Sequence, residues 1–359
     1  MALHDEALLA EVPISGRMLA LPPGPIFHLH RAADSDYQLG EFRAWAGYKT
    51  LGVDAATDGL AHFQHVVSFG ATQDAGRTGV HGHFAHVHAV IPTSGRGVFS
   101  YDGVTTEAVP GVVIHQHGGT IHDQFDYSYA GGSDAETRRT PQSLEPLPPG
   151  ARLQSFGFLE LFVPLRFANV EIVPPTQVTE GDQRSAWDHP YHAKGAAFSL
   201  QAADDPAAAY HPVAGRPDLE ARDGGVWAPS GELCAVWIVR AARGATGSPA
   251  PLAIPGERGG LVILYMVKGS ANVVRDDGEL VRLNAGDCLT ASQDLAGDPV
   301  DPSPDMSLLK IFISGRAEAL RERTPAEIEK LEALGPAIIT RREVRSAGDT
   351  RPVNTLHGS

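Results

Sequence analysis

"VHGHFAHVHA" (residues 80–89) places four histidines within one short stretch: His81, His83, His86 and His88. The whole chain has 16 histidines, so a quarter of them lie here. A buried strand favours Val and Ile, whereas a solvated loop favours small polar residues and Gly. Because neutral imidazoles are common ligands of transition metals, this crowding predicts that several of these side chains converge on a metal ion.

The spacing of these histidines indicates which of them share a face. Side chains alternate along a strand, so His81 and His83 project to one side, while His86 and His88 share a face with each other. A bend or bulge between 83 and 88 would bring His88 back toward the first pair. The best further ligand is His122, which follows a Gly-Gly turn in "GVVIHQHGGTIHDQFD" (111–126).

Short segments rich in β-branched and aromatic residues recur along the chain between frequent Gly and Pro. This pattern is typical of an all-β sandwich or barrel. The segments expected to form strands are 62–70, 156–164, 235–242, 261–269 and 306–315. The polar, Pro- and Gly-rich segment 128–153 is expected to be a long surface loop.

An internal repeat indicates that the β unit is duplicated. Residues 93–111 and 267–286 both contain a glycine, a strand that ends in Asp-Gly, and a further glycine. Each copy is followed by one of the aromatic segments expected to form strands. We therefore predict two tandem all-β domains.

The two histidine segments resemble the two motifs of the cupin superfamily. The first family motif reads His-x-His, three or four residues, Glu, six residues, Gly, and it is similar to His81-x-His83-x4-His88-x6-Gly95. The second reads Gly-x5-Pro-x-Gly-x2-His-x3-Asn, and it is similar to Gly111-x5-His117-x-Gly119-x2-His122-x3-Asp126. The resemblance implies a bicupin, with two tandem jelly-roll (double-stranded β-helix) domains.

The resemblance implies a metal site whose ligand set is His81, His83, His88 and His122. His88 stands where the family usually has Glu, so it either binds the metal or leaves a coordination position open. We expect one divalent transition metal per chain, with Fe(II) favoured and Zn, Cu, Ni and Mn as alternatives. At the four equivalent positions the second copy has Pro255, Glu257, Val262 and Gly297, so that half is expected to be structural.

The predicted domain boundaries follow from this repeat. Residues 1–175 form the metal-binding domain, 176–225 a linker, 226–335 the degenerate second cupin domain, and 336–359 a tail. The second domain ends in a helix over 325–334, because Thr324 and Glu327 form a capping box before an apolar stripe.

Several other residues are candidates for a role at the site. His28 and His30 repeat the His-x-His pattern without its downstream partners, so we expect a strand edge. His115 and His117 share one face and are expected to pack in the ordinary way, although a role near the site is open. Glu160 lies on an apolar strand opposite in phase to Leu159 and Leu161, so it faces either solvent or the site.

Composition excludes several classes of partner. The chain has 43 Asp and Glu against 29 Lys and Arg, giving a formal net charge of −14, and no basic patch suits nucleic acid. No apolar run reaches the roughly 20 residues that a membrane span needs. The N-terminus is acidic and Cys234 and Cys288 are the only cysteines, so we expect a cytoplasmic protein that associates with neither nucleic acid nor membrane.

These features together predict a metal-dependent cupin dioxygenase that cleaves a C–C bond of an aromatic or enolisable small molecule, with O2 as co-substrate. Fungal quercetin dioxygenases look similar in plan, and gentisate-type dioxygenases also lack the Glu ligand. The alternative is a non-redox four-histidine zinc enzyme, such as a cyclase, isomerase or lyase. A third option is a non-catalytic small-molecule-binding bicupin. The sequence identifies no catalytic side chain, and a homodimer is an expectation only.

Overall fold

The fold was analysed in a computed structural model of the chain. It describes residues 24–39, 46–68, 82–83, 85–101, 104–116, 120, 122–130, 136–139, 152–153, 156–163, 170–173, 198–202, 209–254, 259–315 and 338–341.

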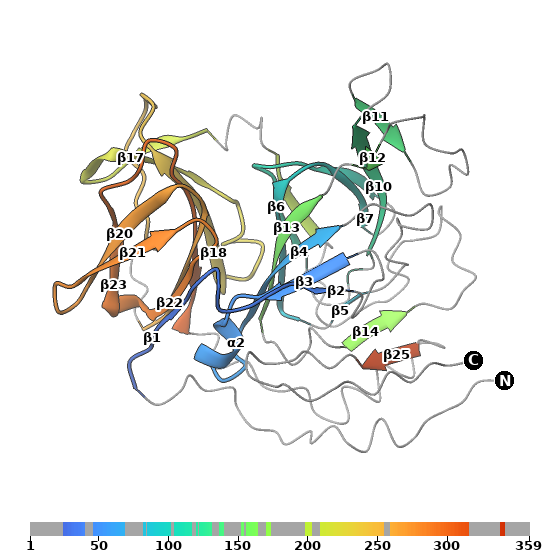
Figure 1. The fold of residues 1–359 in the computed structure, drawn as a ribbon, viewed down its shortest axis with the longest axis horizontal. Helices are drawn as coiled ribbons and strands as arrows, with labels where there is room; N and C mark the ends of the chain where they lie inside the picture. Colours follow the sequence, from blue (N-terminus) through green and yellow to red (C-terminus); the bar gives the residue numbers. More distant parts are fainter. Residues whose placement is uncertain are drawn as a thin grey trace.

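Two large antiparallel sheets form the body of the molecule and have the same strand order (Figure 1). The N-terminal sheet runs β15 (Phe198–Gln201), β9 (Val113–Gln116), β6 (Val87–Ser94), β13 (Gly157–Val163), β4 (His62–Ser68), β3 (Ala46–Thr50), β2 (Gln38–Leu39). The C-terminal sheet runs β1 (Phe27–His30), β22 (Cys288–Ser292), β19 (Leu261–Lys268), β24 (Ser307–Ile313), β18 (Cys234–Ala241), β17 (Arg216–Asp223), β16 (His211–Val213).

A smaller sheet belongs to each large one, and these two also match. The first runs β11 (Glu136–Arg139), β10 (His122–Ala130), β7 (Gly97–Tyr101), β8 (Val104–Ala108), and β12 (Arg152–Leu153) also pairs with β10. The second runs β23 (Ala296–Val300), β20 (Ser270–Arg275), β21 (Leu280–Asn284). We call each large sheet with its smaller sheet the N-terminal and the C-terminal barrel. The matching order confirms the predicted all-β fold of two tandem jelly-roll domains.

The five segments expected to be strands are confirmed with small shifts at their ends, as β4, β13, β18, β19 and β24. The expectation of a surface loop over 128–153 is partly wrong, because β11 and β12 pair with β10 there. Within the segment assigned to the linker, β15 joins the N-terminal sheet, while β16 and β17 belong to the C-terminal sheet. The predicted helix over 325–334 lies outside the described residues.

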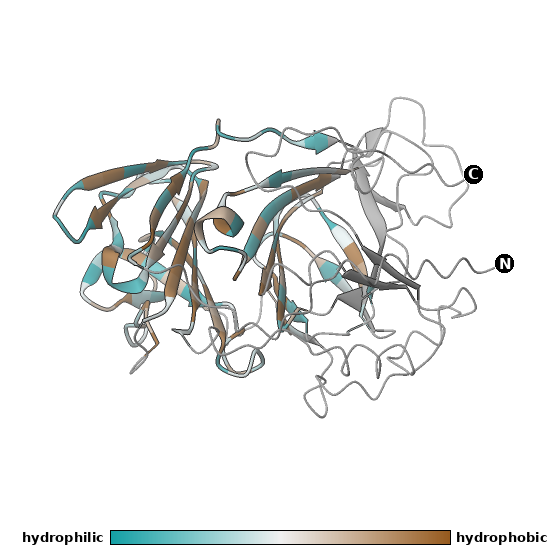
Figure 2. Cartoon of the chain, turned by 90° about the horizontal axis from the view of Figure 1, so that it is seen from below, coloured by the Kyte–Doolittle hydropathy of each residue, from teal (hydrophilic) through white to brown (hydrophobic). Residues whose placement is uncertain are grey.

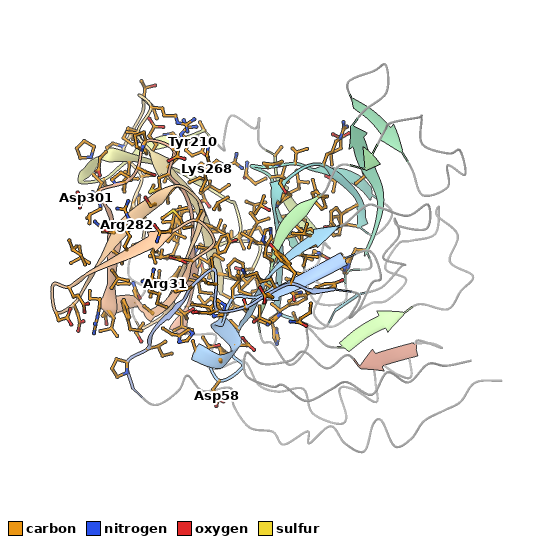
Figure 3. The ribbon with its side chains drawn as sticks, viewed as in Figure 1. Arg31, Asp58, Tyr210, Lys268, Arg282 and Asp301 are labelled. Atoms are coloured by element: carbon orange, nitrogen blue, oxygen red, sulfur yellow. The ribbon has the colours of Figure 1, made fainter. Side chains whose placement is uncertain are left out.

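The N-terminal strand β1 crosses to the C-terminal barrel. It is the edge strand there and pairs with β22, from Phe27 opposite Ala291 to His30 opposite Cys288. Directly after it, the Arg31 guanidinium donates hydrogen bonds to the Arg282 carbonyl at 2.6 Å and to Asp287 at 2.9 Å. Figure 3 labels Arg31 and Arg282 on the C-terminal barrel's side of the molecule. The two barrels are therefore joined by exchanged strands: β1 precedes the N-terminal strands but pairs in the C-terminal sheet, and β15 precedes β16 and β17 of the C-terminal sheet but pairs at the equivalent edge of the N-terminal sheet.

The two large sheets pack against each other and share one apolar core (Figure 2). Leu159 and Leu161 of β13 lie in this core with Ile263 of β19 and Ile311 of β24. Cys234 and Cys288 are free thiols buried in the same cluster. Because this face of each large sheet is occupied by the other barrel, the opposite face points into the interior of its own barrel.

Three further elements lie outside the four sheets of the two barrels. The helix α2 (Val53–Ala56) precedes β4, and a short 3-10 helix η3 (Gln293–Leu295) follows β22. A separate small sheet runs β25 (Ile338–Arg341), β14 (Val170–Val173), β5 (Gly82–His83). In the described part of the chain, no helix has the length and hydropathy of a membrane-crossing segment.

A half-buried histidine on β4, His65, is hydrogen-bonded within the N-terminal part of the chain and contacts one aromatic ring of the C-terminal barrel. Nδ1 of His65 is hydrogen-bonded to the Tyr37 hydroxyl at 2.9 Å, and Nε2 to the Thr93 hydroxyl at 3.0 Å. Its ring lies 6.3 Å from that of Tyr265, which belongs to the C-terminal barrel. Burial, with a smaller contribution from Lys49, lowers the pKa of His65 to about 4 from its ordinary value of 6.5.

We expect the substitution Phe63→Ala to lower the free energy of unfolding by about 3–5 kcal/mol, because it opens a cavity in the shared core. Phe63 is fully buried there and meets Tyr265 edge-on at a centroid distance of 6.0 Å. Urea denaturation followed by circular dichroism measures the loss. Leu280→Ala, at a side chain that is 54% exposed, is the control and should change stability by less than about 0.5 kcal/mol. An equally small loss for Phe63→Ala would contradict the shared core.

His65 should also make stability depend on pH. Because its folded pKa is depressed, its stabilising effect is complete above pH 6.5 and is lost as the pH falls toward 4. Between these two pH values His65 binds a proton in the unfolded chain but stays neutral in the folded chain. We expect His65→Gln to show a smaller drop in urea midpoint between about pH 7.5 and about pH 5 than the unsubstituted chain. An unchanged drop would contradict the lowered pKa of His65, because a group with the same pKa in the folded and unfolded chain makes no contribution to the pH dependence.

Candidate metal centre

His88 lies on β6 and points into the N-terminal barrel. It pairs across the sheet with Phe162 of β13 on one side and Gln116 of β9 on the other. Its neighbour Ala89 points the other way, into the shared core between the barrels. His88 is only 2% exposed, and its ring stacks on Phe162 with centroids 4.2 Å apart.

Glu160 of β13 lies on the same interior face, two residues before Phe162, and pairs with Val90 of β6. Its Oε1 accepts a hydrogen bond from His88 Nε2 at 2.8 Å, and its Oε2 accepts one from Gln64 Nε2 at 2.7 Å. Burial raises the pKa of this carboxyl, but the contacts with His88 and Gln64 and the nearby His122 outweigh burial and hold it below its usual value. The sequence left two orientations open for Glu160, and the one facing solvent is wrong.

His122 opens β10 in the smaller sheet of the same barrel and is 4% exposed. It is paired in register with Tyr101 of β7, and the two rings lie 5.8 Å apart. The ring of His122 is 5.5 Å from that of His88, although 34 positions separate them (122 − 88). The fold therefore brings these two predicted ligands together from two different sheets.

The other two predicted ligands are less fully described. His83 ends β5, which pairs with β14 through Glu171, and its side chain lies outside the described residues, as does all of His81. The chain does change sheet between β5 and β6, as the expected bend requires. Among the described side chains, no group of three His, Cys, Asp or Glu is placed to hold a metal. The four-histidine set thus remains a prediction.

Two further polar residues on the interior face were missed by the sequence analysis. His62 of β4 is fully buried, and burial lowers its pKa, against the opposing effects of Asp54, Gln64 and Glu160. Gln116 is 1% exposed, and neither its amide nitrogen nor its oxygen has a hydrogen-bond partner among the described residues. Strand register places both residues on the interior face, because His62 pairs with Phe162 and Gln116 pairs with His88.

Four further histidines of the described residues lie outside this cluster, and His117 lies outside the described residues. His115 is buried but pairs with Ala89, so it lies on the face opposite His88. His86 is half-buried just before β6, and its backbone N–H donates to the Val163 carbonyl at 2.8 Å. His28 and His30 lie on β1, which is a sheet edge as predicted.

The C-terminal barrel provides an internal comparison. Strand equivalence places Val262 at the position of His88, because Val262 pairs with Phe312 as His88 pairs with Phe162. The remaining equivalent pairs follow from the same strand order: Ala235 for His62, Trp237 for Gln64, Ala291 for Gln116, Ala296 for His122 and Lys310 for Glu160. The internal repeat of the sequence predicted Gly297 as the equivalent of His122, and the structure shifts this by one residue to Ala296. The second barrel therefore has no histidine at any of these positions.

The described residues fit a divalent transition metal in the N-terminal barrel. Two buried imidazoles with centroids 5.5 Å apart are compatible with ligands of one ion, since metal–nitrogen bonds are about 2 Å long. The amide of Gln116, next to His88, has no hydrogen-bond partner among the side chains that the structure describes, which indicates that a polar group belongs in this space. A carboxylate bonded to a ligating imidazole is also the usual support of such sites.

No family model and no curated protein sequence matches the chain. Solved structures that are similar to it include the oxalate decarboxylase of Bacillus subtilis, at 11% identity and a TM-score of 0.48, covering 80% of this chain and 76% of that one. The protein Ylba of E. coli is similar at 11% identity and a TM-score of 0.44, covering 87% of this chain and 98% of that one. At this level neither likeness bears on activity.

Proposed function

We propose that the chain is a metal-dependent enzyme whose single site lies inside the N-terminal barrel, with His81, His83, His88 and His122 as ligands. We further propose that it is an oxygenase, which cleaves a C–C bond of an aromatic or enolisable small molecule with O2. The observation that supports this most is the contrast between the two interiors. One buries polar and imidazole side chains where the other, on an equivalent frame, buries mainly apolar ones.

The charge of the proposed site favours an anionic substrate. Imidazole ligands are neutral, so the nearby carboxylate of Glu160 offsets only part of the 2+ charge of an ion, and an enolate or phenolate would be attracted to the remainder. When bound, such a metal supplies Lewis acidity and, if it is iron or copper, reactivity toward O2. The protein's part is to hold His88 and His122 in place and to exclude bulk water, which their burial achieves.

Aromatic side chains line the neighbourhood of these histidines and suit a flat substrate. Phe162 stacks on His88, and Tyr101 lies beside His122. Phe99 stacks in turn on Tyr101, with centroids 5.7 Å apart. Rigid aromatic surfaces favour planar ligands, which supports a phenolic or diketone-like substrate over a flexible aliphatic one.

A non-redox zinc enzyme is the second candidate. The rings of His88 and His122 lie 5.5 Å apart, which is compatible with both binding one ion and supports a site of four neutral histidines. Such a site would serve a cyclase, isomerase or lyase through Lewis acidity alone.

Elemental analysis of the purified chain, combined with an oxygen electrode, distinguishes the two candidates. We expect about one transition metal per chain and O2 uptake in the presence of some member of a panel of phenolics and β-diketones. Zinc at that level, with no uptake after reconstitution with Fe(II) or Cu, would contradict the oxygenase and favour the non-redox enzyme.

The ligand assignment is tested by substitution of two histidines in different barrels. We expect His122→Ala to lower the metal content of the purified chain at least about tenfold, because one of the few ligands is lost. His28→Ala is the matched control, since His28 is an exposed residue of β1, and it should retain its metal. Circular dichroism verifies that both variants are folded. Equal metal content in the two would refute the assignment.

A further inference from the structure

The environment of Glu160 assigns it a role that the histidine motifs do not show. Its carboxylate is held from both neighbouring strands, by His88 of β6 and by Gln64 of β4, so each oxygen has its own donor. The Glu160 side chain is 14% exposed and that of His88 is 3% exposed. Two such short bonds in a buried setting fix the carboxylate and, through it, the ring that it contacts.

The hydrogen bond to Glu160 also selects the tautomer of a neutral His88 ring. A neutral imidazole carries one N–H and one lone pair, so a ring that donates from Nε2 has its lone pair on Nδ1. Phe162, stacked at an interplanar angle of 15°, restricts the plane of the same ring. His88 is therefore held in one tautomer and one orientation by two residues of β13.

The position of Glu160 is not required by the fold. Its equivalent in the C-terminal barrel is Lys310, which has the opposite charge and donates to Asp298 at 2.7 Å. The equivalents of its two partners, Trp237 and Val262, are apolar. The C-terminal barrel thus has the same strand order without a carboxylate at this position. A glutamate is found at it only in the barrel that has the histidines.

We propose that Glu160 is a positioning residue of the metal site. It holds His88 in the tautomer that presents Nδ1 to the ion, and it supplies from β13 the negative charge that a glutamate at position 88 would supply directly. This inference rests on the metal site of the proposed function, but not on the oxygenase reaction.

The test is a Co²⁺ titration of the full chain after its metal has been removed with a chelator. We expect Glu160→Gln to weaken Co²⁺ binding by about 10- to 100-fold, as the loss of a ligand's hydrogen-bonded carboxylate usually does. The visible absorption of the bound Co²⁺ should shift as well. Lys310→Gln, at the equivalent position of the other barrel, is the matched control and should leave both affinity and spectrum unchanged.

A double-mutant cycle separates positioning from direct binding. If Glu160 acts through His88, then Glu160→Gln has no further effect in a His88→Ala background. A further tenfold loss in that background would overturn the positioning role, because Glu160 would then act on the ion itself. Equal affinity and spectrum for Glu160→Gln and the unsubstituted chain would also overturn it, while leaving the metal site intact.

A second variant guards against misfolding of Glu160→Gln. Gln64→Leu keeps the carboxylate but removes its other donor, so we expect a smaller loss of affinity in the same direction, and no loss would count against the proposal. If the unsubstituted chain binds no Co²⁺, the metal site of the proposed function fails and the positioning role fails with it.

Discussion

The packing of the two large sheets against each other is the constraint on which the rest of the structure depends. It removes one face of each sheet from water, so every strand in the middle of these sheets is buried on both sides. Along β13 this gives two sets of side chains: Leu159 and Leu161 enter the core between the barrels, while Glu160 and Phe162 enter the N-terminal barrel. The core between the barrels is mainly apolar, whereas the hydrogen-bonded cluster of His88, Glu160 and Gln64 lies in the interior of the N-terminal barrel.

The duplicated frame shows how one interior could be specialised. Both barrels place equivalent residues in register, so their differences lie in side chains and not in architecture. In the N-terminal barrel His88 and Glu160 form a bonded pair of a ring and a carboxylate. In the C-terminal barrel Val262 lies in place of the ring, and Lys310 reaches Asp298 instead. A buried pair needs its partners to be retained together, since a lone buried charge is costly.

The strands could be predicted from the sequence because Gly and Pro mark their ends and β-branched residues fill them. The role of Glu160 could not, since alternation shows only that it opposes Leu159, and in a sheet buried on both faces neither set is solvent-facing. The sequence also placed the strand β17 in the linker, because the burial of its charged residues could not be predicted from their type. Its sequence RPDLEARD looks solvated, but Glu220 is buried and accepts hydrogen bonds from Arg240 and from backbone N–H groups. The convergence of His88 and His122 was predicted because its signal is motif spacing.

The central claim is that a transition metal binds between His88 and His122 and that the second barrel binds none. A crystal structure of the metal-loaded chain, with anomalous scattering recorded at the absorption edge of the metal, tests this most directly. The account predicts one anomalous peak per chain, within bonding distance of both rings. A peak inside the C-terminal barrel, or a peak in the N-terminal barrel that neither His88 nor His122 contacts, would contradict it.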